Sequence, residues 1–387
     1  MAAPTVVVTK AGADRLRRGQ VWVFRRDLAG TPEAAPGSIV RVADPRGNFV
    51  AHAFLGPAEP ALRLLGRDER EPGPDLFRER LRAAIDRRRA LLGERDAVRL
   101  VHAEADLLPG LLVDRLGDGL VMQSLALAVE QREAMLVEML LELQRPRVLV
   151  LRNDGATRDR DGLPRRRAVI HGDDPAVSYH EGELLLSANL LEDQKTGAFL
   201  DQLDNHLRAG EYARGRVLDL FCYHGGFGLQ AARRAEQVTC IDQSETAVER
   251  ARRNAETNGL HNVTARVGNA FDEARAAVES RQRYQLVILD PPAFAKRHSA
   301  LAGAHRAYKD LNLRALRLLE PGGILISCSC SARMTPDLFE ELLQDAAVDA
   351  KRRVVVLERR GAGRDHPVLL GVPETGYLKC LVLQALE

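Results

Sequence analysis

Two cysteines near the end of an apolar stretch are the residues of this sequence best suited to covalent chemistry. A strand is predicted over residues 323–330, and period-two alternation places Cys328 and Cys330 on one of its faces. Cys330 lies nearer the carboxyl edge, where a thiolate could attack an electron-poor ring carbon if its neighbours lower its pKa. The alternative is a buried, inert thiol, which is how an isolated cysteine normally behaves.

A second candidate is the acidic corner Asp290-Pro291-Pro292-Ala293-Phe294, which follows the predicted strand 284–290. Proline cannot pair inside a sheet, so the strand must stop here at its carboxyl edge. An acid, two stiff residues and an aromatic ring make a planar slot that can stack a heterocycle and bond its edge. An ordinary proline-terminated strand explains the segment equally well by itself, but the nearby cysteines favour a nucleophile at this edge.

A third candidate is a glycine turn between the predicted strands 216–221 and 237–242. Asp219 precedes Gly225 and Gly226, and Asp242 ends the next strand, where a carboxylate suits a ribose diol. The turn is neither GxGxxG nor GxxxxGK[ST], so neither a dinucleotide nor a nucleoside triphosphate is favoured. Asp219 suits a cationic ligand such as S-adenosylmethionine, although a lone Gly-Gly pair can also be merely a turn.

These motifs lie on strands that alternate with amphipathic helices, a pattern typical of a parallel α/β sheet. The N-terminal 71 residues instead show short strands between turns and end at the breaker Glu71-Pro72-Gly73-Pro74. The sequence therefore predicts a β-barrel-like domain over 1–72, an α+β middle domain over 73–188 and a third domain over 189–387.

Composition excludes several classes of protein. The 387 residues are 45% hydrophobic and 28% charged with net charge +2, which is compatible with folded domains and not with wholesale disorder. Five cysteines without CxxC spacing predict neither a disulfide scaffold nor a metal site. With no signal peptide and no apolar run long enough to span a membrane, we expect a soluble cytoplasmic protein without membrane contact.

Jointly, these motifs resemble a known family over nearly the whole chain: the 23S rRNA (cytosine-5-)-methyltransferase I type, among the class I S-adenosylmethionine-dependent methyltransferases. The segments that carry the resemblance are Gly19–Phe24, Glu104–Leu111, Lys195–Gly197, Asp290–Phe294, Tyr308–Asp310, Ser329–Ser331 and Asp365–Pro367. The resemblance implies an N-terminal PUA domain that binds RNA, an α+β middle domain and a Rossmann-like domain with a mostly parallel seven-stranded sheet.

The resemblance also implies an activity, which is methylation of cytosine C5 in ribosomal RNA with S-adenosylmethionine as cofactor. Cys330 would add to C6, Asp290 would bond the base edge, and Phe294 with Pro291 and Pro292 would form the slot for a base that has left its stack. The base that removes the C5 proton stays open between Lys309, Asp310 and His366. The expected cofactor contacts are Gln202, Asp219, Phe221, Tyr223, Gly225, Gly226, Asp242, Asn269 and Asp290, and the expected RNA contacts include Trp22 and Arg25.

Several alternatives remain at this point. Position 328 holds a second cysteine where an aromatic is more usual, and Asn269 stands where an acid commonly contacts the adenine. An N-methyltransferase acting on guanine or adenine would use the acidic corner without a thiol, and a non-catalytic ribosome assembly factor would need neither. The sequence also leaves open whether the chain forms a homodimer.

Overall fold

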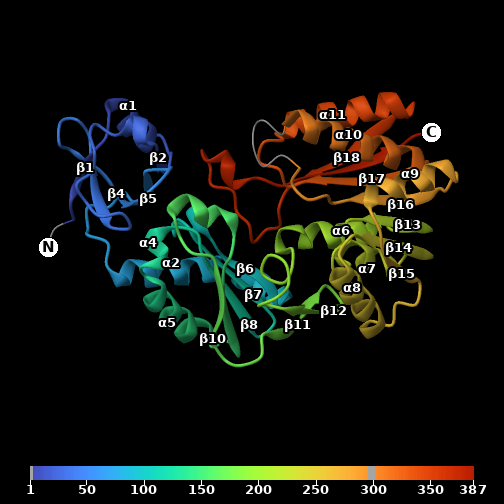
Figure 1. Cartoon of the computed structure of the whole chain (residues 1–387), viewed down its shortest axis with the longest axis horizontal. Helices are drawn as coiled ribbons and strands as arrows, with labels where there is room; N and C mark the ends of the chain where they lie inside the picture. Colours follow the sequence, from blue (N-terminus) through green and yellow to red (C-terminus); the bar gives the residue numbers. More distant parts are fainter. Residues whose placement is uncertain (1–2, 295–300) are drawn as a thin grey trace. The chain divides into compact units, whose positions relative to one another are not determined.

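The computed structural model describes residues 3–294 and 301–387, and contacts divide the chain into two compact units (Figure 1). The first unit takes in the chain up to residue 179, with residues 188–199 and 365–375; the second holds residues 180–187, 200–364 and 376–387. Within the described residues, no helix combines the length and apolar character needed to cross a membrane.

The first unit begins with a five-stranded sheet whose order is β1-β3-β4-β5-β2. Its strands are β1 (Thr5–Val7), β2 (Trp22–Val23), β3 (Ile39–Ala43), β4 (Phe49–Leu55) and β5 (Leu62–Gly66). The short strands that the sequence predicts for this region are present. The helix α1 (Lys10–Arg17) was not predicted, because only a few apolar residues mark its buried face; Thr9 caps it by accepting the Gly12 N–H at 3.1 Å.

The same unit contains a second sheet of five strands in the order β10-β9-β8-β7-β6. They are β6 (Ala97–His102), β7 (Leu111–Leu116), β8 (Gly119–Ser124), β9 (Val148–Asn153) and β10 (Arg166–His171), with helices α2 (Pro74–Arg87), α3 (Arg89–Glu94), α4 (Leu127–Glu130) and α5 (Glu133–Gln144). Helices α2 and α3 meet at buried Arg88. Its guanidinium bonds Asp106 at 2.6 Å and the Asp365 carbonyl at 2.9 Å, as a buried charge requires.

A two-stranded sheet of β11 (Ala176–Glu181) and β12 (Leu184–Asn189) follows, and each strand contributes residues to both units. The division into three domains proposed from the sequence stays a prediction.

The second unit is built on a seven-stranded sheet in the order β15-β14-β13-β16-β17-β19-β18. Its strands are β13 (Arg216–Leu220), β14 (Gln237–Asp242), β15 (Val263–Val267), β16 (Tyr284–Leu289), β17 (Leu319–Ser329), β18 (Val354–Arg360) and β19 (Lys379–Ala385). The first five run parallel, while β19 is antiparallel to β17 and to β18. The expected Rossmann-like sheet, mostly parallel and seven-stranded, is confirmed.

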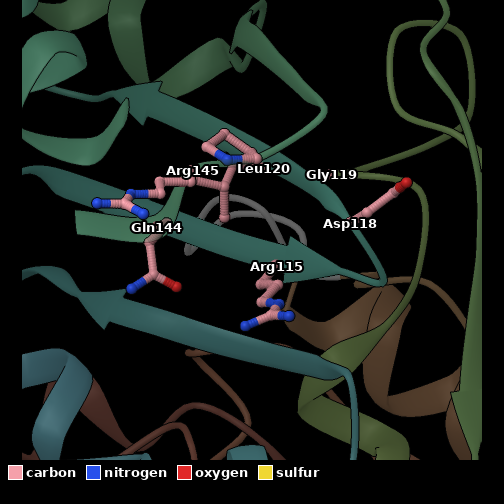
Figure 2. Close-up of a pocket in the computed structure, with 7 residues that line it drawn as sticks. Arg115, Asp118, Gly119, Leu120, Gln144 and Arg145 are labelled. Carbon is pink, nitrogen blue, oxygen red and sulfur yellow. The ribbon is translucent and has the colours of Figure 1, made fainter. Parts of the chain in front are cut away.

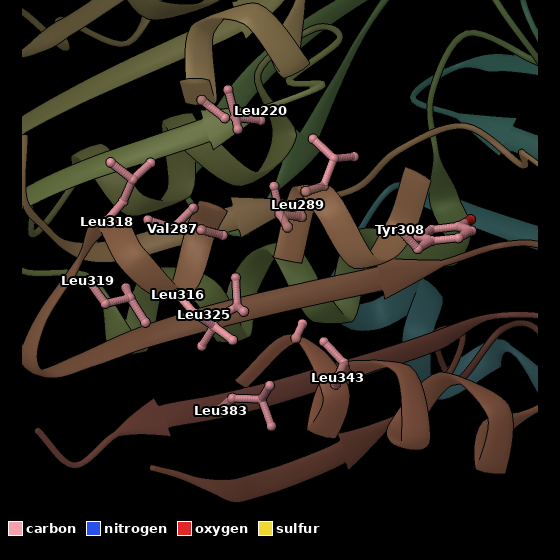
Figure 3. Close-up of a cluster of buried hydrophobic side chains, with 14 of the residues drawn as sticks. Leu220, Val287, Leu289, Tyr308, Leu316, Leu318, Leu319, Leu325, Leu343 and Leu383 are labelled. Carbon is pink, nitrogen blue, oxygen red and sulfur yellow. The ribbon is translucent and has the colours of Figure 1, made fainter. Parts of the chain in front are cut away.

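Helices cover both faces of this sheet, as its apolar strands require. One face packs against α6 (Leu203–Tyr212), α7 (Gly226–Ala232) and α8 (Glu245–Thr257). The other packs against α9 (Ala270–Glu279), α10 (Leu301–Leu318) and α11 (Pro336–Ala350). Figure 3 shows this second cluster, in which Leu220, Leu289 and Leu325 from three neighbouring strands meet helix residues such as Leu343.

Strand direction decides which residues can share a site. The carboxyl ends of β14, β13, β16 and β17 lie side by side at one edge of the sheet, which is where ligands bind in open α/β folds. Because β19 is antiparallel, it begins at that same edge, and its first residue Lys379 pairs with Ser329.

Candidate active site

The glycine turn joins β13 to α7 and holds Asp219 beneath it. The Asp219 side chain is fully buried, and its Oδ2 accepts the Gly228 N–H at 2.8 Å. Its Oδ1 is buried without a hydrogen-bond partner in the described part of the chain. Burial raises the pKa of Asp219 to about 7. A buried acceptor without a hydrogen bond lowers the stability of the fold, unless a ligand donates a hydrogen bond to it.

Packing within the protein explains the glycines of the turn. Gly225 has φ +90°, which disfavours a side chain. A Cβ on Gly226 would lie 2.3 Å from the His206 ring, and one on Gly228 would lie 2.3 Å from Cys240 Sγ. Phe221 and Tyr223, at φ +69° and +49°, are held in the left-handed region although they are not glycine. Such conformations need strong support from their surroundings and cluster at functional sites.

Asp242 ends β14 beside this turn. Its Oδ2 accepts the Tyr223 N–H at 3.0 Å and its Oδ1 accepts the Ser244 N–H at 2.9 Å. The half-buried carboxylate is thereby fixed with lone pairs still available for a diol. Asn269 caps α9, because its Oδ1 accepts the Phe271 N–H at 2.9 Å. Any adenine contact from Asn269 would therefore come from its NH₂ group as a donor.

Asp290 lies just past the end of β16, between the ends of β13 and β17. Its N–H approaches the Leu220 carbonyl at 3.5 Å. Its Oδ1 accepts the Gln202 Nε2–H at 2.9 Å, and Gln202 Oε1 in turn accepts from Asn205 at 2.7 Å. Gln202, expected to contact the cofactor, is therefore a buried residue that orients the Asp290 carboxyl.

The two candidate cysteines lie in different environments. Cys328 is fully buried opposite Cys380 in the register of β17 and β19, and burial raises the pKa of its thiol well above the usual value. Cys330 is the first residue after β17 and is partly exposed, whereas the other four cysteines are buried. Its thiol points to the Pro291 carbonyl, with 4.0 Å between Sγ and the oxygen. This brings the thiol and the acidic corner together, as the sequence predicted.

A row of aromatic rings borders the acidic corner. Ring centroids lie 6.4 Å apart for Phe221 and Phe271, 6.0 Å for Phe271 and Phe294, and 4.8 Å for Phe294 and Tyr308. The Tyr308 hydroxyl accepts a hydrogen bond from Ser329 Oγ at 3.1 Å. Phe294 is thus held by neighbouring rings at the slot, and Tyr308 connects that slot to the end of β17.

Two residues of this edge were missed from the sequence. Lys379 is buried beside the end of β17, and its location depends on an antiparallel strand nearly fifty residues further along the chain. His206 lies under the glycine turn, with Nδ1 2.8 Å from Glu181 Oε1. Burial alone would lower the pKa of His206, but the Glu181 carboxylate outweighs it, and the pKa is raised. Neither residue has a local sequence signal that could have identified it.

The three candidate proton acceptors each have a charged partner near them. Lys309 Nζ lies 2.9 Å from Asp349 and 3.7 Å from Asp345 on α11, and these carboxylates raise its pKa. Asp310 is paired with Arg314 at 2.9 Å. His366 belongs to the first unit, where its Nδ1 lies 2.9 Å from Asp365. The structure does not bring Lys309 into contact with Cys330 or Asp290.

Known protein families match two regions of the chain, and curated relatives match nearly all of it. A methyltransferase domain family matches residues 213–359, and a PUA-like domain family matches residues 6–67. The Ribosomal RNA large subunit methyltransferase I of Tolumonas auensis is 37% identical and covers 99% of each chain. That of Photobacterium profundum is 39% identical over 97% of this chain and 98% of its own.

This chain belongs to the ribosomal RNA large subunit methyltransferase I family. The solved structure of SMU.776 complexed with SAH shares the fold, with a TM-score of 0.86 at 21% identity, and covers 98% of this chain and 100% of that chain.

In this family member, the residues of the glycine turn fit a sulfonium cofactor. The unpartnered Asp219 Oδ1 can accept from an ammonium group, and Asp242 can accept from a ribose. These residues could therefore hold S-adenosylmethionine at this edge of the sheet.

The residues expected to contact RNA lie in the first unit and have partners there. Trp22 Nε1–H donates to Glu104 Oε1 at 3.0 Å, which also accepts from Arg63 at 2.9 Å. Arg25 Nη2–H donates to the Pro57 carbonyl at 2.5 Å. Beside them, Arg26 lies 5.7 Å from the centroid of the exposed Phe24 ring. Trp22 is thus partly structural, and the Arg26–Phe24 pair is the more accessible combination of charge and ring.

A small cavity of about 100 Å³ in the first unit is unrelated to these residues. Arg115 and Asp118 lie at its edge near the β7–β8 turn, with Gln144 and Arg145 at the end of α5 (Figure 2). None of the predicted site residues lines it.

Proposed function

We propose that this chain transfers a methyl group from S-adenosylmethionine to C5 of a cytosine in large-subunit ribosomal RNA, through a covalent bond between Cys330 and C6. Methylation of ribosomal RNA with this cofactor follows from the family. The atom modified and the covalent intermediate are the proposal. The observation that carries it is the partly exposed Cys330 thiol, 4.0 Å from the Pro291 carbonyl at the acidic corner.

The chemistry explains why a thiol is needed at this corner. Cytosine C5 is too weak a nucleophile to accept a methyl group directly. When Cys330 Sγ bonds to C6, the electron pair of the C5–C6 double bond moves to C5 and makes that carbon nucleophilic. S-adenosylmethionine supplies the electrophilic methyl group when bound. Removal of the C5 proton returns an electron pair to the ring and expels Cys330.

Asp290 is the residue that would hold the base. Gln202 fixes its carboxyl at the carboxyl edge, next to Pro291 and the Cys330 thiol. A carboxyl there can bond the N3 and amino edge of cytosine and stabilise the charge of the adduct. Phe294 would stack on the ring, which must leave its neighbours in the RNA to enter the slot.

Removal of the C5 proton needs a group with a free lone pair. Lys309 is paired with Asp349 and Asp345 and has a raised pKa, so it is charged at neutral pH and has no lone pair to accept a proton. A base must be unprotonated at the pH of the reaction.

Product analysis tests the target atom. Ribosomal RNA that lacks the modification should gain 5-methylcytidine when incubated with the protein and S-adenosylmethionine, as seen by nuclease digestion and mass spectrometry. An N-methylated guanosine or adenosine would contradict the proposal and favour the N-methyltransferase alternative. No methylated nucleoside at all would favour a non-catalytic assembly factor.

Arg26→Ala should weaken RNA binding without changing cofactor affinity. Its guanidinium stacks near exposed Phe24 and can neutralise one phosphate, so the slope of log affinity against log salt should fall by about one. Filter binding at several salt concentrations measures this, and calorimetry measures the cofactor. Arg17→Ala is the matched control, because Asp44 already holds Arg17 at 2.8 Å. Equal effects of the two substitutions would show that the Arg26–Phe24 pair has no special role.

A further inference from the structure

Lys379 is a buried cation at the active edge that the proposed mechanism does not yet use. Its side chain is only 7% exposed at the start of β19. Nζ donates to the Ser331 carbonyl at 2.6 Å and to the Tyr377 carbonyl at 2.7 Å. Within the described residues it forms no ion pair with a carboxylate. Two neutral carbonyls only partly replace the water that an ammonium loses on burial.

The position of Lys379 is set by Cys330's own strand. The register of β17 and β19 pairs Lys379 with Ser329, the residue before Cys330. Its ammonium bonds the carbonyl of Ser331, the residue after Cys330. The backbone on both sides of the thiol is therefore tied to this lysine.

The side chains of Lys379 and Cys330 also interact electrostatically. Burial lowers the pKa of Lys379 to about 8, while a negative charge on Cys330 acts in the opposite direction and raises it. This coupling is reciprocal, since a thiolate that favours the ammonium is itself favoured by the ammonium. Two other groups lie near the thiol. Asp290 precedes Pro291, whose carbonyl the thiol approaches, and its carboxylate would disfavour a second negative charge. Tyr308 on α10 is neutral because burial raises its pKa, and it interacts electrostatically with both Cys330 and Asp290.

We propose that Lys379 is a positioning residue that keeps Cys330 in its thiolate form against the opposing charge of Asp290. The proposal deepens the function above and rests on Cys330 being its nucleophile. In this step the Cys330 S–H bond breaks, its electron pair stays on sulfur, and the proton passes to water. Lys379 keeps its own proton and supplies only positive charge and a fixed backbone.

Burial of the Lys379 ammonium lowers the stability of the fold, because the charge loses its water. A residue with a purely structural role would not need to carry that charge. An apolar side chain of similar length would fill the same space at the start of β19 without desolvating a charge. In other proteins, a cation beside a cysteine lowers the pKa of the thiol and makes it reactive. A charge within about 4–6 Å typically shifts the pKa of a neighbour by one to three units.

The test is the pH dependence of Cys330 alkylation in the full-length protein. Wild type, Lys379→Gln and Lys379→Met are treated with iodoacetamide between pH 5.5 and 10, and carbamidomethylation of the Cys330 peptide is followed by mass spectrometry. In both variants, we expect the midpoint of the rate profile to rise by about one unit or more, so that alkylation near pH 7 is roughly tenfold slower. Lys379→Arg should keep most of the wild-type profile, because it keeps the charge.

Two controls separate charge from structure. The glutamine variant can still donate to a backbone carbonyl, so a shift in Lys379→Gln is not explained by loss of both hydrogen bonds. Thermal unfolding of each variant shows that it is folded, and Lys379→Met is expected to melt no lower than wild type. An unchanged alkylation profile in a folded Lys379→Gln or Lys379→Met protein would overturn the proposal.

Failure of this inference is distinguishable from failure of the proposed function. Alkylation needs neither RNA nor S-adenosylmethionine, so it reports the thiol alone. If Cys330 titrates low only when Lys379 is present, yet Cys330→Ala still methylates RNA, then the thiolate pair is real and the covalent mechanism is wrong. If Cys330→Ala is inactive but the profile ignores Lys379, the mechanism stands and Lys379 has no part in it.

Discussion

Cys330→Ala is expected to lower methyl transfer by about a thousandfold or more while cofactor affinity stays unchanged. The substitution removes the partly exposed thiol at the acidic corner, and without it C5 of cytosine is not activated. Asp219 and Asp242, two of the expected cofactor contacts, lie on β13 and β14, two and three strands away from β17 in the sheet order. Tritiated methyl incorporation and isothermal titration with cofactor measure the two halves.

Cys328→Ala is the matched control for this experiment. Cys328 lies only two residues away but is fully buried opposite Cys380, with a raised thiol pKa. Its removal leaves a small apolar gap, so a modest loss of stability is expected and methyl transfer should persist. Full activity of Cys330→Ala with loss in Cys328→Ala would exchange the two assignments.

A mechanism-based trap separates covalent from direct methylation. RNA that carries 5-fluorocytidine has no C5 proton to remove, so the bond from Cys330 to C6 should persist after methylation. Wild type and Cys328→Ala should then form a complex stable in denaturing gels, and Cys330→Ala should not. Absence of any such complex with an active wild-type enzyme would argue against the adduct.

The parallel part of the site could be predicted from the sequence because local signals mark it. Strand direction brings the ends of consecutive β–α units to one edge, so the sequence predicts Asp219, Asp242 and Asp290 at that edge. The same rule placed Cys330 near Asp290, since β16 and β17 are neighbours in the sheet.

What could not be predicted depends on contacts between distant segments. The environment of Cys330 includes Lys379, which reaches the edge only because β19 runs antiparallel to β17. The amide of Gln202 donates to Asp290, a residue 88 positions away in sequence. Lys309 lies in the Tyr308–Asp310 segment, which carries part of the family resemblance. Its ammonium is paired with carboxylates of α11, and the sequence does not indicate this pairing. Pairings of this kind have no periodicity or spacing that would reveal them.

Asp219→Asn should raise the dissociation constant for S-adenosylmethionine by roughly thirtyfold or more at pH 8, since removing one partner of a buried charge pair costs about 2–5 kcal/mol. The pKa of Asp219 is raised to about 7, so the wild-type carboxyl is ionised at pH 8 and increasingly protonated below pH 7. A protonated carboxyl resembles an amide in charge, so the difference between wild type and variant should shrink as the pH falls to 6. Calorimetric titrations at these two pH values test the trend, with the exposed Asp272→Asn as control.

The same substitution should act on stability in the opposite direction. The pKa of Asp219 is higher in the folded protein than its ordinary value of 3.8, so the folded state keeps a proton that the unfolded state loses between pH 3.8 and about 7. The stability contributed by this proton is fully present below pH 3.8 and is lost as the pH rises to about 7. Without cofactor at pH 8, Asp219→Asn should therefore melt at a higher temperature than wild type, and saturating cofactor should reverse that order. A variant that is less stable without cofactor and still binds it tightly would mean that Asp219 supports the fold and not the ligand.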